Sequence, residues 1–244
     1  MTEFKNREGV LAYTINTTVC DFDAKGEMTL FAVMKFQEDA AEKQANEVGL
    51  GYEEMYSQNM AFLVNSTQNI IHRMPKYNEK ITIYTWSDHT KGVRFYRGFE
   101  WYNQDGEHLI SSCNVYVLVD IENHRPLPST RLYKTLDSVP HGNDAINRKP
   151  HAILDNVKSV GTRKIMYTDL DLNNHLNNAR YADIIQNFLP DFNRAIKYFC
   201  INFVKELKLD MCVDVKSDTC DNTTYICGEC DDEIRFKGCV EYAD

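Results

Sequence analysis

The sequence predicts an α+β protein made of two similar units, and two observations carry this prediction. A helical pattern followed by four strand-like segments occurs twice along the chain. A polar, proline-marked stretch at 138–150 separates the two occurrences. We therefore expect a first unit at 1–137, a linker at 138–150 and a second unit at 151–244. No residue string repeats, so a single irregular α+β domain stays open as an alternative.

In the first unit, an extended opening stretch precedes a helix expected over 36–60. Apolar residues recur there at helical spacing until Gly49 and Gly51 interrupt the pattern, so 52–59 is expected to form a second helical piece. The segments that follow are rich in β-branched and aromatic residues, and Asp105-Gly106 predicts a hairpin. The four expected strands span 61–73, 80–89, 93–103 and 108–120.

The second unit repeats this order. A strand expected over 159–166 leads to a polar loop at 168–178, and a helix follows that Asn177 or Asn178 caps and Pro190 ends. Four more strands are expected at 196–207, 211–218, 223–229 and 233–241. We expect each set of four strands to form an antiparallel meander with the helix on one face.

Composition and charge exclude several classes. With 27 basic and 36 acidic residues among 244, the net charge is −9, which argues against a nucleic-acid partner. No segment reaches the roughly 18 uncharged apolar residues of a membrane-spanning helix, so no membrane insertion is expected. The N-terminus carries no hydrophobic signal sequence. We expect a cytoplasmic protein with its eight cysteines reduced, and both a monomer and a homodimer stay open.

The polar loop at 168–178 holds the strongest chemical pattern. In an extended loop, Asp171, Asn173 and His175 alternate and point to one side. An acid, an amide and an imidazole would then lie beside a helix N-terminus, whose free N–H groups favour a developing negative charge. Hydrolysis of an ester or thioester needs such groups. Asn and Asp are also frequent in loops that only cap a helix. The spacing alone favours neither a catalytic loop nor a capping loop.

The run from Asp171 to Asn178, together with Tyr181, resembles the signature of acyl-ACP thioesterases, a family built from two tandem hotdog units. The similarity covers nearly all of residues 8–242. Further residues that carry it are Gln37, Ala40, Pro75, Thr85, Trp86, Arg97, Asp105, Gly106 and Asp120.

The resemblance implies a catalytic set of Asp171, Asn173, His175 and Glu206. From its own segment, Glu206 would be taken for a surface glutamate between lysines. Leu207 stands where plant members have a cysteine, so we expect attack by water or by a carboxylate and no cysteine nucleophile. The resemblance implies no cofactor and no metal. A zinc site at Cys227 and Cys230 is not expected, because these side chains would face opposite sides of a strand.

The resemblance also places the acyl chain in the first unit and an acidic acyl carrier protein as the partner. Candidate pocket residues, for which plain core packing is the alternative, are Val48, Tyr52, Met55, Met60, Phe62 and Val64. Phe62 stands where many relatives have tryptophan. Candidate carrier-docking residues, for which scattered solubilising charge is the alternative, are Arg163, Lys164, Arg180, Arg194, Lys197, Lys205 and Lys208.

The predicted function is hydrolysis of fatty acyl-ACP to a free fatty acid and the carrier, within fatty-acid biosynthesis. An acyl-CoA thioesterase is one alternative, since the fold alone does not choose the carrier. A non-catalytic acyl-binding protein is the other, and we would expect it to lack part of the set Asp171, Asn173, His175 and Glu206.

Overall fold

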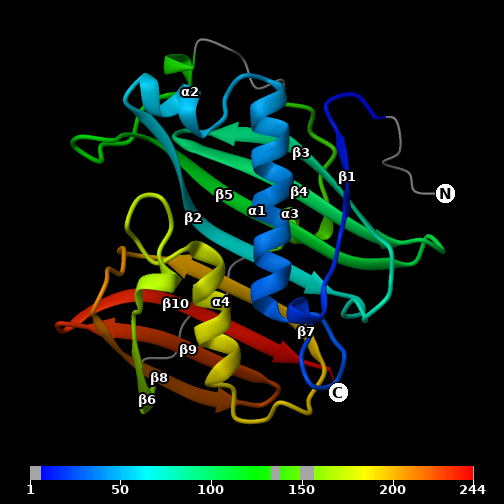
Figure 1. The fold of residues 1–244 in the computed structure, drawn as a ribbon, viewed down its shortest axis with the longest axis vertical. Coiled ribbons are helices and arrows are strands. Elements are labelled where there is room, and N and C mark those ends of the chain that lie inside the picture. The colour runs from blue at the N-terminus through cyan, green and yellow to red at the C-terminus, as the bar shows by residue number, and fades with distance from the viewer. Residues whose placement is uncertain (1–6, 133–137, 149–156, 244) are drawn as a thin grey trace.

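The computed structural model describes residues 7–132, 138–148 and 157–243, and its strands form one ten-stranded antiparallel sheet (Figure 1). The strands of the first half are β1 Leu11–Ile15, β2 Met60–Ile71, β3 Ile81–Lys91, β4 Arg94–Asn103 and β5 His108–Asp120. Those of the second half are β6 Lys158–Lys164, β7 Ile196–Phe203, β8 Cys212–Cys220, β9 Thr223–Cys230 and β10 Glu233–Tyr242. The helices are α1 Leu30–Glu47, α2 Tyr52–Ser57, α3 Asp144–Asn147 and α4 Asn178–Asn187. Each half therefore has a strand, a helix and four further strands, and the predicted duplicated α+β fold is confirmed.

The order across the sheet is β1-β3-β4-β5-β2-β7-β10-β9-β8-β6, and it corrects the expected meanders. β3, β4 and β5 do form a meander, but β2 pairs with β5 instead of β3. In the second half β7 likewise pairs with β10 instead of β8. The physical reason is that β1 and β6, the strands before the two long helices, pair with β3 and β8. They occupy the places that a simple meander would give to β2 and β7.

Pairing of β2 with β7 joins the two halves, with Thr67 opposite Ile201 and Gln68 opposite Cys200. The sheet therefore runs without interruption from β1 to β6. The expected boundary at 150/151 lies outside the described residues and that at 137/138 lies at their edge, so the division into domains stays a prediction. Within the expected linker, α3 packs against the sheet, and Ala145 is buried against Cys113 and Val115 of β5.

The first long helix begins at Leu30, earlier than expected, because the Thr29 side chain accepts a hydrogen bond from the N–H of Ala32. It ends at Glu47, and Gly49 follows with a φ of 72°. The chain then forms the separate short helix α2, which confirms the second helical piece. In the second half Asn177 is the N-cap of α4, where its side chain accepts from the N–H of Ala179.

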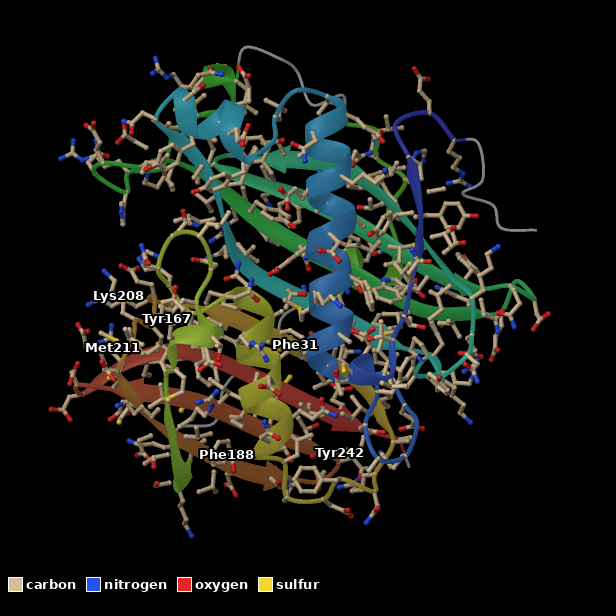
Figure 2. All side chains as sticks on the ribbon, in the orientation of Figure 1. Phe31, Tyr167, Phe188, Lys208, Met211 and Tyr242 are labelled. Carbon is tan, nitrogen blue, oxygen red and sulfur yellow. The ribbon has the colours of Figure 1, made fainter. Side chains whose placement is uncertain are left out.

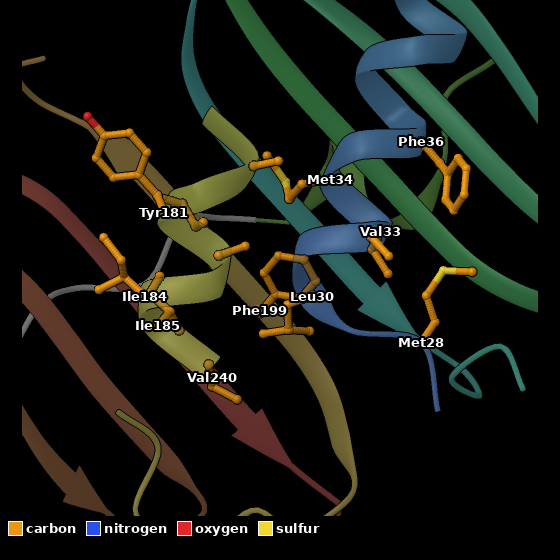
Figure 3. Packing of buried hydrophobic residues seen from close by; sticks show 14 of the residues in the cluster. Met28, Leu30, Val33, Met34, Phe36, Tyr181, Ile184, Ile185, Phe199 and Val240 are labelled. Atoms are coloured by element: carbon orange, nitrogen blue, oxygen red, sulfur yellow. The ribbon is translucent and has the colours of Figure 1, made fainter. Parts of the chain in front are cut away.

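The helices α1 and α4 lie side by side on one face of the sheet and run in opposite directions (Figures 1 and 3). Their contact is apolar, with Leu30 and Met34 of α1 facing α4 over Phe199 of β7 (Figure 3). Burial of a side chain of this size stabilises the fold by about 1.5–3 kcal/mol. The N-terminus of α4 consequently lies beside the middle of α1, and the N-terminus of α1 lies beside the C-terminal end of α4. None of the described helices is long and apolar enough to cross a membrane.

Gly98 of β4 is a close-packing point of the first half. A Cβ at this position would lie 2.3 Å from Cζ2 of the fully buried Trp86 on β3. We predict that Gly98→Ala lowers the free energy of unfolding by about 1–3 kcal/mol, because the indole must move within a packed core. Urea unfolding would measure the loss. The double variant Gly98→Ala/Trp86→Phe should lose less than the two single changes combined, and strict additivity would contradict the clash.

Candidate active site

The loop before α4 is a tight turn held by one carboxylate. Oδ1 of Asp171 accepts hydrogen bonds from the backbone N–H of Asn173 at 2.8 Å and of His175 at 3.2 Å. The Asp171 N–H donates to the carbonyl of His175 at 2.8 Å. Asn174, at the tip, has a φ of 59°. The expectation of an extended loop with alternating side chains was therefore wrong, since the carboxylate folds the backbone around itself.

Neighbouring elements fix this loop in place. The N–H of the buried Leu176 donates to the carbonyl of Leu207 at 2.7 Å, so the loop lies beside Glu206. Burial alone would raise the pKa of Glu206, but a backbone N–H and the positive charges of His175 and Lys208 bring it below its usual range. The hydrogen bond between Leu176 and Leu207 thus brings the segments that carry His175 and Glu206 next to each other. Figure 2 shows Lys208 and Tyr167 at this end of the second half.

The first half also contributes to the site. From α2, the hydroxyl of Tyr52 donates to Oδ1 of Asn173 at 3.2 Å. From α1, Oε2 of Glu38 accepts a hydrogen bond from Nδ2 of Asn177 at 3.3 Å. Residues from the two halves thus meet at the N-terminus of α4, where free N–H groups favour negative charge.

Glu38 is the site residue that the sequence analysis missed. Burial raises its pKa to about 7; the hydrogen bond from Asn177 opposes this shift, while the negative charges of Asp39 and Asp171 reinforce it. Its Oε1 is buried and has no hydrogen-bond partner among the described residues. In the sequence, Glu38 lies between Gln37 and Asp39 in a polar helical segment, and nothing in that pattern indicates a buried carboxyl.

The loop before α1 has the same backbone course. Oδ1 of Asp23 accepts from the N–H of Lys25 at 2.8 Å and of Glu27 at 3.0 Å. Gly26, with a φ of 74°, stands where the second loop has Asn174. This first loop borders a cavity of about 610 Å³ near the C-terminal end of α4. The duplication therefore extends to the loops, although Lys25 and Glu27 replace an amide and an imidazole.

Comparison with known proteins decides the family. A family model described as the acyl-ACP thioesterase N-terminal domain matches residues 10–131, and one described as the C-terminal domain matches residues 155–241. The chain belongs to the acyl-ACP thioesterase family. As a member it is a hydrolase that acts on thioester bonds.

Two solved structures have the same fold. An acyl-ACP thioesterase from Bacteroides thetaiotaomicron is 18% identical with a TM-score of 0.88, and the match covers 96% of this chain and 98% of that one. A 12:0-ACP thioesterase from Umbellularia californica is also 18% identical, with a TM-score of 0.84 and coverage of 97% and 98%. These similarities confirm the tandem hotdog architecture. No curated protein sequence matches the chain significantly.

The predicted pocket residues of this thioesterase fall into two groups. Met55 and Met60 are buried in one apolar cluster with Leu50 and Leu118, and Phe62 packs against it. Val48 and Tyr52 are instead 40% and 38% exposed. Val64 is half-buried on β2. The cluster around Met55 and Met60 is thus the apolar group next to α2, while Tyr52 contacts Asn173 in the loop before α4.

The predicted docking residues are spread over both ends of α4. Several are engaged with acidic or aromatic side chains: Arg163 with Asp169, Lys164 with Asp210, Arg180 with Asp183 and Phe31, Arg194 with Tyr242, Lys205 with Glu233, and Lys208 with Glu206. Arg194 and Lys197 line the cavity at the far end of α4. Only part of the set therefore lies near the loop at 167–178.

The clustered cysteines contribute no ligand group to this site. Cys227 and Cys230 lie on β9, and both are buried thiols. The described residues contain no group of three or more His, Cys, Asp or Glu side chains arranged to hold a metal ion. Cys200 of β7 and Cys239 of β10 have their sulfur atoms 3.2 Å apart in a buried cluster with Tyr198, separate from the core formed with α1 and α4.

The tip of the loop before α4, at Asn174, has a left-handed backbone conformation, which gives a test. We predict that Asn174→Gly keeps kcat within about threefold of wild type, since glycine adopts a positive φ without strain, as Gly26 does in the other loop. Asn174→Val should lower kcat at least tenfold, because a β-branched residue resists this conformation. Steady-state kinetics would compare them. Equal activity of the two variants would contradict the role of the turn.

Proposed function

We propose that the chain hydrolyses fatty acyl-ACP at the loop from Asp171 to Asn178. One observation carries the proposal: the hydrogen bond from Leu176 to Leu207 brings the segments of His175 and Glu206 together beside the N-terminus of α4, and Tyr52 from the other half reaches Asn173. This supplies a group for protons, a carboxylate and donors for an oxyanion in one place. The family match, which covers both halves, supports acyl-ACP as the substrate.

The proposed reaction is attack of water on the thioester carbonyl. Asn173 and the N–H groups at the start of α4 polarise the carbonyl and hold the oxyanion. Glu206 and His175 position the water and take its proton. Asp171 holds the loop, because Oδ1 already accepts two backbone N–H groups. This use of its carboxylate favours an orienting role for Asp171 over direct attack.

The acyl chain is proposed to enter the apolar cluster of the first half. Met55, Met60 and Phe62 belong to this cluster, and α2 connects it to the loop through Tyr52. An apolar chain in that position would bring its thioester to the N-terminus of α4. Dry apolar walls with a few polar groups at the mouth are typical of ligand pockets.

A panel of substrates tests the function. We predict that the protein releases free thiol from long-chain acyl-ACP with a kcat/KM at least tenfold above that for the matching acyl-CoA, because an acidic carrier gains from a basic surface. His175→Ala should lose about 100-fold or more in kcat, as expected for a group that transfers protons. Faster turnover of acyl-CoA would favour the alternative carrier. Binding of acyl-ACP without turnover would instead support a non-catalytic protein.

Lys164 and Lys205 are the proposed centre of the carrier-docking surface, since both are about half exposed beside the catalytic loop. We predict that Lys164→Glu/Lys205→Glu raises KM for acyl-ACP about tenfold and weakens its salt dependence, because like charges oppose docking. Kinetics over a range of salt concentrations would measure this. Lys197→Glu, at the far end of α4, is the matched control. Equal effects of both variants would contradict a local surface.

A further inference from the structure

The two halves provide an internal comparison for Glu38. Glu38 is the ninth residue of α1, and Gln186 is the ninth residue of α4. Each lies against the N-terminus of the other half's helix: Gln186 Oε1 accepts from the N–H of Leu30 at 2.8 Å, and Glu38 Oε2 accepts from Asn177 at 3.3 Å. The same structural position thus holds an amide at one end of the helix pair and a carboxyl at the other.

The contact at a helix N-terminus requires only an acceptor oxygen, and Gln186 shows that an amide supplies it. A carboxyl at position 38 is not needed for the fold. It is moreover costly, because its Oε1 is buried without a partner among the described residues. The carboxyl stands at the end whose loop carries His175, while the amide stands at the end whose loop has Glu27 in the corresponding place. This difference links the acid at position 38 to the chemistry.

Glu38 contacts the end of the loop through Asn177, and its charge also acts on Tyr116, which packs against the apolar cluster. On β5, burial raises the pKa of Tyr116, and the charge of Glu38 adds to this shift. Tyr116 packs edge-on against Phe62 at a centroid distance of 6.3 Å. The charged groups that face this region are Asp39 on α1, Asp171 in the loop and, behind Tyr116, Arg97 of β4.

We propose that Glu38 is a further catalytic residue, the general acid that protonates the leaving sulfur; this rests on the proposed hydrolysis. Water attacks the carbonyl carbon as its proton passes to the pair His175 and Glu206. When the tetrahedral oxyanion reforms the carbonyl, the C–S bond breaks with its electron pair on sulfur. The proton of Oε1 on Glu38 moves to that sulfur, which gives a carboxylic acid and a thiol. The proton on His175 returns to Glu38 through solvent.

The assignment of acid and base follows from the two environments. Two carboxyls whose surroundings push their pKa values apart are suited to opposite roles. Glu206, lowered by His175 and Lys208, stays ionised and acts on the base side. Glu38, raised to about 7 chiefly by burial and also by Asp39 and Asp171, retains its proton into the neutral range. The rate should therefore fall as the pH rises through about 7 and Glu38 loses its proton.

The test compares leaving groups. An alkyl thiolate needs a proton to depart well, whereas an aryl thiolate does not, so acyl-pantetheine and the matching acyl 5-thio-2-nitrobenzoate are the two probes. Glu38→Gln, which keeps an acceptor oxygen as Gln186 does, should lower kcat for acyl-pantetheine about 100-fold and for the aryl thioester less than about fivefold. Its fall in rate above neutral pH should disappear. Gln186→Glu, the reciprocal change at the other end, is the matched control and should keep wild-type rates.

An equal loss on both probes would overturn the proposal, since it would indicate a structural role, and so would wild-type kinetics of Glu38→Gln. The wild-type pH profile is a second measurement that needs no variant: the decrease above about 7 must occur with acyl-pantetheine and not with the aryl thioester. Absence of wild-type turnover on acyl-ACP would instead contradict the proposed function, so the two failures are distinguishable.

Discussion

The pairing of β2 with β7 is the interaction on which the rest of the structure depends. It joins two five-stranded halves into one sheet and so sets the position of α1 against α4. With the helices antiparallel on the same face, each helix N-terminus lies against the other half: Asn177 meets Glu38 at one end, and Leu30 meets Gln186 at the other. A site at either end is therefore composite, and neither half could form it alone.

The two ends of the helix pair share a backbone and differ in chemistry. Asp23 and Asp171 each accept hydrogen bonds from the backbone N–H groups two and four residues ahead. The aspartate at this position therefore stabilises the turn in both loops. The side chains that the turn then presents are free to differ. One end presents His175 on a segment next to that of Glu206, and the other presents Glu27 and Lys25, which pair with each other at 3.2 Å. Duplication thus supplied the scaffold, and a few side chains confine the proposed chemistry to one end.

Much of this fold could be predicted from the sequence, because helical and strand periodicity mark each element and their order repeats. The pairing of β2 with β5 could not, since strand partners depend on which sheet edges other elements occupy. The loop pattern drew attention to Asp171 and His175, but its extended form was a wrong expectation, because an aspartate can hydrogen-bond N–H groups two and four residues ahead. Glu38 was missed for a related reason: its contact with Asn177 bridges 139 residues, and no local pattern encodes it.

The central claim is that thioester hydrolysis occurs at the N-terminus of α4 and depends on residues from both halves of the chain. A crystal structure with a thioether analogue of an acyl-pantetheine, which cannot be hydrolysed, tests it most directly. The account predicts three positions for the analogue. The atom that replaces the carbonyl carbon lies beside Asn173 and His175, the sulfur lies next to Glu38, and the alkyl chain lies in the cluster of Met55 and Met60. An analogue bound instead in the cavity beside Asp23, at the other end of α4, would contradict it.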